Sequence, residues 1–249
     1  MNYFKSTLSL LLSSSLFTSA YAAVIYQDDF DSYPEDSSLS SSPNWVTHSG
    51  TEGQIVVQNG AITLTDTNSE DIGVEFVPVS SGELFFSVDV TISDPGSYGS
   101  DHEYWMHFMS TSSGGFNSRT DFQLKESGFT AGIAGNSSTA QSVWGTDLVY
   151  DTTYKVVVGY DFSDSISTLW IDPTSSSDTN IVGTAATANS LQKFGFRQSG
   201  ASGTQLITFD NLIIADDFNS AAAVAVPEPS SYALLVGIFG MTWLLCRRR

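Results

Sequence analysis

The stretch SDHEYWMHF, residues 100–108, holds the densest group of side chains in the sequence that could recognise or cleave a sugar. Alternate residues of a β-strand share one face, so a strand here would gather two carboxylates, an indole and an imidazole. The residues on that face would be Asp101, Glu103, Trp105 and His107. Paired carboxylates can cleave a glycosidic bond, and an indole can stack on a sugar ring. The stretch is therefore a candidate glycan site.

An edge strand with one solvated face explains the same residues without any chemistry. In that interpretation the buried face carries His102, Tyr104, Met106 and Phe108. We favour it, because residue types that suit a function do not establish that function. Trp144, in the stretch AQSVWGTD, is a second candidate for stacking on a glycan, although aromatic side chains more often pack in the core.

Metal and nucleophile chemistry find less support in the sequence. His102 and His107 have an odd separation, so a regular strand would point them to opposite faces, which disfavours a paired zinc site. Oxygen ligands for Ca²⁺ could come from Asp161 and Asp164 in the turn DFSDS or from the acidic stretch 28–36, yet such residues more often form turns. No G-x-S-x-G stretch marks a nucleophile. We expect no cofactor, with calcium at Asp161 and Asp164 as the alternative.

Short apolar runs with alternating faces predict that residues 23–218 form one all-β domain. In residues 83–92 the apolar face holds Leu84, Phe86, Val88, Val90 and Ile92. In residues 152–162 it holds Tyr154, Val156, Val158, Tyr160 and Phe162. Asn59-Gly60 between two apolar runs predicts a hairpin, and the DFSDS turn predicts another. Many short antiparallel strands of this kind indicate a jelly roll or β-sandwich.

The charge balance excludes a nucleic-acid partner. The chain has 27 acidic and 9 basic residues, a net charge of −18. Setting aside Lys5, Glu228 and the three terminal arginines leaves 26 acidic and 5 basic residues for the middle of the chain. Such a surface repels DNA, RNA and anionic lipid. The single cysteine, Cys246, lies near the C-terminus, so the β domain has no disulfide and must be stabilised by its core.

The N-terminal 22 residues have the pattern of a secretory signal peptide. Lys5 precedes the serine-diluted apolar run LSLLLSSSLF, and Ala20 and Ala22 supply the small residues that signal peptidase needs for cleavage after Ala22. We therefore expect the protein to be exported through the secretion machinery.

The C-terminal residues 226–249 combine three features. Pro227 and Pro229 keep a Val-Pro-Glu-Pro segment extended. Residues 232–246 are uncharged and would form a helix of roughly 22 Å, short for a bilayer core of about 30 Å. Arg247, Arg248 and Arg249 would then stay on the cytoplasmic side. Residues 219–225 form a small-residue linker to this tail.

In this order of parts the tail resembles the PEP-CTERM sorting signal of Gram-negative bacteria that secrete polysaccharide. The matching residues are Val226, Pro227, Glu228 and Pro229, then the apolar segment, then the terminal arginines. The resemblance implies transient anchoring in the membrane and cleavage by an exosortase-type protease. The β domain would then remain on the cell surface or in the extracellular matrix.

The β domain itself resembles the concanavalin A-like lectin and glucanase jelly roll. The resemblance rests on the opening VIYQDDFDSYP, on Trp45, on the hairpin YKVVVGYDFSDSISTLWIDP and on the closing ITFDNLIIADDF. It implies that the first and last strands are neighbours, so that Asp29-Phe30 lies near Phe209-Asp210. Glucanases of this fold carry an E-x-D-x-x-E or E-x-D-x-E motif, and the sequence has neither.

Together these observations predict an exported, exosortase-processed protein without catalytic activity. Its domain would bind carbohydrate or serve a structural role within exopolysaccharide. The alternative is a glycoside hydrolase or polysaccharide lyase with an unfamiliar site, in which Asp101 and Glu103 would be the first candidates and His107 would assist.

Overall fold

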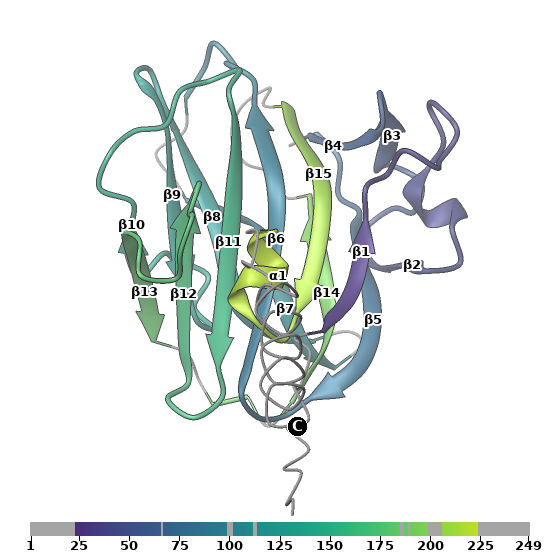
Figure 1. The fold of residues 1–249 in the computed structure, drawn as a ribbon. Helices are drawn as coiled ribbons and strands as arrows, with labels where there is room; N and C mark the ends of the chain where they lie inside the picture. The colour runs from purple at the N-terminus through teal and green to yellow at the C-terminus, as the bar shows by residue number, and fades with distance from the viewer. Residues whose placement is uncertain are drawn as a thin grey trace, which may run out of the picture.

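Two antiparallel β-sheets pack face to face in the computed structural model (Figure 1). The structure describes residues 23–65, 67–98, 102–111, 114–184, 187–188, 190–198 and 206–223. The all-β sandwich expected from the alternating apolar residues is therefore confirmed. The predicted signal peptide, Pro-Glu-Pro element and terminal arginines lie outside the described residues.

The eight-stranded sheet contains the first and last strands of the domain. Its order is β13 (Asn180–Thr184), β12 (Ile166–Ile171), β11 (Thr153–Asp161), β6 (Glu83–Ile92), β15 (Leu206–Ala215), β4 (Ala61–Thr65) and β3 (Val56–Gln58), with β1 (Val24–Asp28) also paired to β15. The pairing of β1 with β15 is antiparallel and matches Asp28 with Leu212. The predicted neighbourhood of the two ends of the domain is thus confirmed.

The seven-stranded sheet covers the other side of the core. Its order is β10 (Ser142–Val143), β9 (Gly128–Ala134), β8 (Gly114–Lys125), β7 (Glu103–Thr111), β14 (Leu191–Arg197), β5 (Asp71–Val79) and β2 (Trp45–Ser49). A short 3-10 helix, η1 (Leu39–Ser41), precedes β2. Strand β7 therefore lies between β8 and β14, although β14 is about 80 residues away in the sequence.

The apolar alternation of the sequence builds the core between the sheets. All five predicted inward residues of β6 are fully buried, and Val156, Val158 and Tyr160 of β11 join them. On the facing sheet Phe108, Phe194 and Phe196 point inward, and Phe86 packs against Phe108 and Phe194 with ring centroids 5.1 and 4.9 Å apart. Aromatic rings therefore join the two layers at the centre of the sandwich.

Both predicted hairpins are present. Asn59 and Gly60 link β3 to β4 and both have positive φ, 53° and 74°, as a two-residue turn between twisted strands requires. Strands β11 and β12 pair from Asp161–Ile166 onward. Asp161 accepts hydrogen bonds from the backbone N–H and the hydroxyl of Ser163, each at 2.7 Å, and so shapes that turn.

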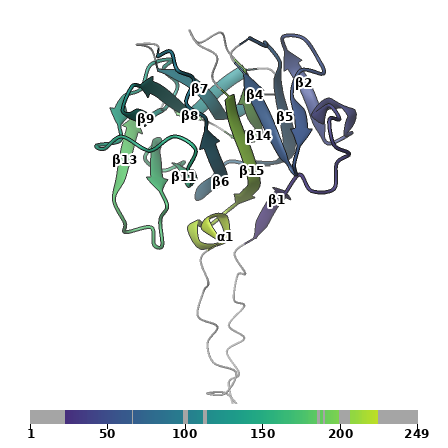
Figure 2. The ribbon, with the colours of Figure 1, turned by 90° about the horizontal axis from the view of Figure 1, so that it is seen from above.

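A short helix closes the described chain. Helix α1 (Phe218–Ala222) begins after Asp217, whose carboxylate accepts a hydrogen bond from the Ser220 N–H. It lies on the outer face of the eight-stranded sheet (Figures 1 and 2). There Phe218 packs against Phe85 and Trp170. The assignment of residues 219–222 to a linker was wrong, because capping and burial of small side chains make them helical.

Within the part of the chain that the structure describes, no helix is long and apolar enough to cross a membrane. The predicted segment 232–246 lies beyond that part.

Candidate functional site

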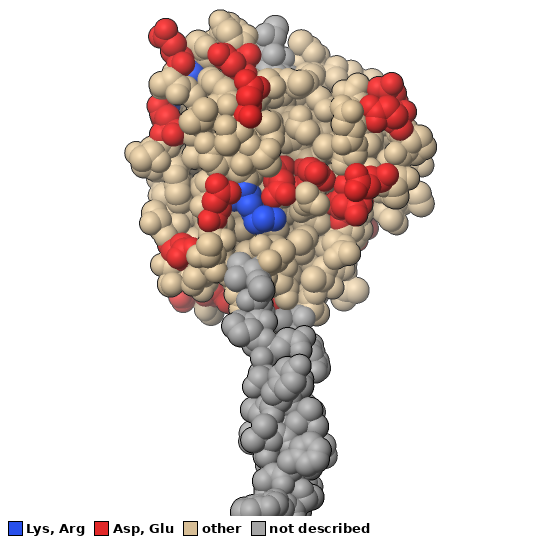
Figure 3. Space-filling model, turned by 45° about the horizontal axis from the view of Figure 1, so that its top comes forward, with Lys and Arg blue, Asp and Glu red and all other residues tan. Residues whose placement is uncertain are grey.

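Basic side chains gather on the outer face of the seven-stranded sheet. Because Phe194 and Phe196 point into the core, the alternate residues Lys193 and Arg197 of β14 point outward. Arg119 of β8 joins them. The described residues contain five Lys and Arg side chains, and three of the five gather here. Figure 3 views the molecule obliquely from the side of the other sheet, where the charged residues in view are mostly Asp and Glu.

Two of these arginines stack on one aromatic ring. Tyr104 belongs to β7, the strand between β8 and β14. The guanidinium carbon of Arg119 lies 4.5 Å from the centroid of the Tyr104 ring, and that of Arg197 lies 4.2 Å from it. Arg119 also lies 5.0 Å from the centroid of Phe116. Cation–π contacts of this kind hold the planar faces of both guanidinium groups.

A pocket of about 550 Å³ opens beside Arg119. Its walls come from the end of β7, the start of β8, and the connections that follow β9 and β13. The residues that line it are Ser110, Thr111, Gly115, Phe116, Asn117, Arg119, Asn136, Thr187, Ala188 and Ser190. Hydroxyls, two amides, one aromatic ring and one cation thus face a common space. We call these residues the Arg119 pocket.

Two buried polar atoms of this pocket have no hydrogen-bond partner among the described residues. Arg119 Nε is buried and has no hydrogen-bond partner, and no described carboxylate forms an ion pair with this arginine. Burial lowers the pKa of Arg119, the Tyr104 side chain raises it and Arg197 lowers it further, but arginine remains charged at neutral pH. Asn117 donates to the Gly115 carbonyl at 2.9 Å, while its own Oδ1 is buried without a partner.

The other two cations of this group, Arg197 and Lys193, have acidic neighbours. Arg197 donates to Glu103 Oε2 at 3.4 Å, and both side chains are about one quarter exposed. Lys193 is 1% exposed, and burial lowers its pKa while Glu75 raises it. The charge of Arg119 is therefore the least compensated of the three within the described structure.

A half-buried histidine, His48, and a buried one, His107, lie beside the arginines. The rings of His48 and His107 are 6.3 Å apart, and His107 packs edge-on against Phe116 at 4.9 Å. Burial lowers the pKa of His48 to about 4 and that of His107 well below its usual range, and nearby cations add to both effects. Neither ring has a hydrogen-bond partner. Both imidazoles are therefore neutral at pH 7.

Glycine makes this approach of the two histidines possible. Gly195 of β14 and Gly73 of β5 are register partners on the strands that separate β7 from β2. A Cβ atom at Gly195 would lie 2.9 Å from His107 Nε2 and 3.5 Å from His48 Cε1. The imidazoles thus meet over backbone that carries no side chain.

The residues predicted from SDHEYWMHF do not share one face. The register of β7 against β8 shifts at Tyr104–Met106 and again at Met106–Phe108, which breaks the regular alternation. Trp105 is 1% exposed within the main core, and Tyr104 lies outside it under the two arginines. Glu103 pairs with Arg197, and Asp101 lies outside the described residues. The alternation expected for this strand was wrong because of these irregularities.

Trp144 follows β10 and is partly buried against the main core. Its backbone N–H donates to the Ala131 carbonyl at 2.8 Å, and its own carbonyl accepts from the Thr130 hydroxyl. These contacts fix the loop to the edge of the sheet. A role for Glu103 or Trp144 in glycan binding stays a prediction.

The predicted calcium ligands lie in the β11–β12 turn. The hydrogen bonds from Ser163 lower the pKa of Asp161, and the formation of the turn accounts for this residue. Across the described residues, no cluster of three or more His, Cys, Asp or Glu side chains has a geometry suited to a metal ion. Calcium binding at Asp161 and Asp164 stays a prediction.

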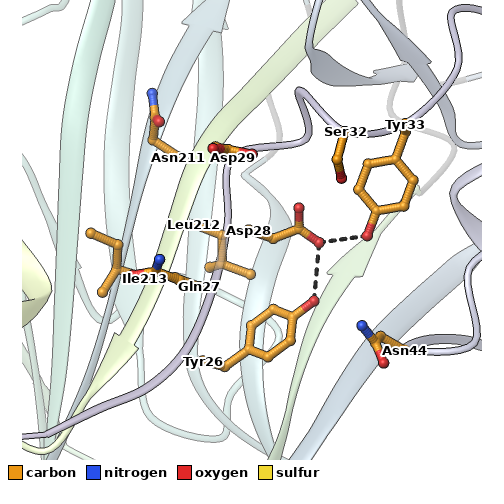
Figure 4. Close-up of a pocket in the computed structure, with 10 residues that line it drawn as sticks. All are labelled: Tyr26, Gln27, Asp28, Asp29, Ser32, Tyr33, Asn44, Asn211, Leu212 and Ile213. Carbon is orange, nitrogen blue, oxygen red and sulfur yellow. Dashed lines mark hydrogen bonds between the residues drawn. The ribbon is translucent and has the colours of Figure 1, made fainter.

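A second pocket, of about 430 Å³, lies beside β1 (Figure 4). Its central group is the Asp28 carboxylate, which accepts hydrogen bonds from the hydroxyls of Tyr26 and Tyr33 at 3.0 and 2.7 Å. It also accepts from the Trp45 indole N–H at 2.9 Å and the Phe30 N–H at 3.0 Å. Four donors satisfy this carboxylate, so its role is to join β1 to the loop that follows it and to β2.

Tyr104, Arg119 and Arg197 were not predicted as site residues. One signal was available, because arginines are rare in so acidic a domain. Their convergence on one ring depends on the order β8-β7-β14, which spacing along the chain does not reveal.

Comparisons with known proteins agree on the fold. No protein-family model and no curated protein sequence matches the chain. Peanut lectin, solved with a 9mer peptide, matches 78% of this chain and 97% of its own, with a TM-score of 0.51 and 17% identity. A Lotus tetragonolobus seed lectin matches 77% of this chain and 97% of its own, with a TM-score of 0.51 and 10% identity. A sialidase matches over 78% of this chain but only 18% of its own, with a TM-score of 0.52 and 13% identity. The chain has the concanavalin A-like jelly-roll fold of these legume lectins.

Proposed function

We propose that this protein binds carbohydrate in the Arg119 pocket, as a non-catalytic member of an exopolysaccharide layer. The observation that carries the proposal is the lining of the pocket. Hydroxyl and amide groups of Ser110, Asn117, Asn136 and Thr187 surround a space of about 550 Å³, with Phe116 as an apolar wall. Sugars are bound by this combination of an apolar ring face and hydrogen-bonding edges. The lectin-like fold supports the proposal by analogy alone.

A glycan array probed with the purified full-length protein tests this function. We expect binding to at least one class of glycan, and we expect Phe116→Ala and Asn136→Ala to weaken that binding. Thr153→Ala on the outer face of the opposite sheet should leave binding unchanged. Binding to no glycan, including the polysaccharide of the producing cell, would contradict the proposal and leave a structural role.

Export and processing complete the proposed function. The signal-peptide pattern of residues 1–22 and the tail pattern of residues 226–249 support secretion, transient anchoring and cleavage near Pro227-Glu228-Pro229. The protein would then stay on the cell surface or in the extracellular matrix. Intact-mass measurement of the protein recovered from its native host tests this: a mature species that retains residues 232–249 would refute processing. Glu228→Ala should block cleavage, whereas Glu103→Ala should not affect it.

A further inference from the structure

Among the described residues, the least compensated cation borders the proposed sugar pocket. Of the three cations gathered beside β7, Arg197 has Glu103 and Lys193 has Glu75. Asp121, two residues beyond Arg119 on β8, instead binds His102 Nδ1 at 2.6 Å. Arg119 is thus left without a described acidic partner. In a chain of net charge −18 such a cation is unusual, and a half-buried one is costly unless a charge opposes it.

The aromatic contacts of Arg119 set the direction in which it can bind a ligand. Tyr104 at 4.5 Å and Phe116 at 5.0 Å are stacking contacts with the guanidinium group. Stacked guanidinium groups keep the N–H donors of their edge free, and two parallel donors match the two oxygens of a carboxylate. Because Arg119 lines the pocket together with the hydroxyl and amide groups, a carboxylate and the hydroxyls of one sugar unit could be bound together.

We propose that the ligand of the Arg119 pocket is an acidic sugar whose carboxylate is bound by the Arg119 guanidinium. This inference rests on the proposed carbohydrate binding and adds the chemical class of the ligand. A hexuronic acid residue within a polysaccharide has the required group. Asn117 and Asn136 then bind hydroxyls of the same sugar, and Phe116 packs against its ring. The rest of the domain is mostly negative, so binding of an anion here depends on the cations gathered on this face, of which Arg119 lines the pocket.

Calorimetric titration of the full-length protein with two matched probes tests the inference. The probes are an oligoglucuronate and its methyl ester, in which a methyl group on each carboxyl removes the charge. We expect the acid to bind at least about tenfold more tightly than the ester, as a charge-assisted hydrogen-bonded pair implies. Arg119→Gln should abolish this preference, because it should weaken binding of the acid far more than binding of the ester. Arg119→Lys, which keeps the charge but not the paired donors, should retain part of it.

Lys125→Gln is the matched control, since Lys125 lies at the end of the same strand and already pairs with Asp147 at 2.7 Å. It should keep the full preference for the acid. Equal binding of acid and ester by the unmodified protein would overturn the inference while leaving carbohydrate binding intact. So would a preference that survives in Arg119→Gln. Binding of neither probe nor of any other glycan would refute the proposed function as well. Thermal unfolding of each variant verifies that it is folded.

Discussion

Both outer faces of the sandwich carry aromatic rings, but different groups cover these rings on the two faces. On the eight-stranded sheet, Phe85 and Trp170 are covered by helix α1 through Phe218, and Ser87 donates a hydrogen bond to the Ala221 carbonyl of that helix. On the seven-stranded sheet, Tyr104 is covered by the guanidinium groups of Arg119 and Arg197. A helix buries its aromatic rings permanently, whereas a stacked arginine keeps polar donors available at the surface.

The two outer faces also differ in the charge of their side chains. On the eight-stranded sheet Asp89 pairs with Lys155 at 3.1 Å, and Asp210 lies beside Asp89. Burial raises the pKa of Asp210, and Asp89, Asp31 and Asp29 raise it further. Arg119 on the other sheet has no such opposing group. The two sheets therefore have outer faces of similar architecture. They differ in side-chain charge, and the basic groups on the seven-stranded sheet make that face the more favourable one for an anion.

The largest expected effect is on the helix-covered face. Phe218→Ala should lower the free energy of unfolding by about 3 kcal/mol, because it removes the ring that fills the space between Phe85 and Trp170. Urea denaturation measures this change. Sugar binding by the folded variant should stay the same, and a loss of binding in step with stability would show that the two faces are not independent.

Acidic pH should lower the stability of the fold through the two histidines on the seven-stranded sheet. His48, with a pKa of about 4, and His107 are neutral in the folded state and titrate near pH 6.5 when unfolded. The unfolded chain therefore binds more protons between those values, and stability is lost as the pH falls from about 6.5 to about 4. The loss should be roughly 2 kcal/mol, a figure reduced for the partial exposure of His48.

Asp71 opposes this trend, because burial raises its pKa to about 6 despite the nearby Arg197. The informative measurement is therefore the difference between the unmodified protein and His107→Leu, taken by urea denaturation at several pH values. We expect the unmodified protein to lose more stability on acidification than the variant. Identical pH profiles would show that His107 is accessible to protons in the folded state.

Removal of the Arg119 charge should lower the free energy of unfolding by a smaller amount. Arg119→Gln eliminates two cation–π contacts and should destabilise the fold by about 1 kcal/mol. Lys125→Gln removes only an exposed ion pair and should cost less than about 0.5 kcal/mol. Thermal melts of the two variants side by side decide whether stacking, rather than charge alone, holds Arg119 in place.

The smallest effect should have the opposite sign. Asp210→Asn removes one charge from the acidic group on the eight-stranded sheet and keeps an oxygen that can accept from the Asn211 N–H. We expect a stabilisation of less than about 0.5 kcal/mol, observed as a small rise in Tm at pH 7 and absent at pH 3, where the carboxyl is protonated. Destabilisation at pH 7 would mean that the hydrogen bond from Asn211 to the carboxylate outweighs the repulsion from the neighbouring acidic residues.

The sequence by itself determined the local structure of this protein. Alternation in β6 and β11 identified the buried face because side chains of a strand point to opposite sides, and Asn59-Gly60 identified a turn because both residues tolerate positive φ. Composition also showed that the β domain has no disulfide. Each of these properties depends on neighbours within a few residues, so spacing along the chain is enough to find it.

Only the tertiary structure decided the site. The register shifts of β7 place Trp105 in the core and Tyr104 outside it, and they arise from pairing with β8 rather than from the sequence of β7 alone. The order β8-β7-β14 then brings Arg119 and Arg197 to the same ring. Strand order depends on how all the apolar faces pack together, which is a property of the whole chain. The sequence alone therefore does not show which face could bind a ligand, because that face is built from strands that are distant in the sequence.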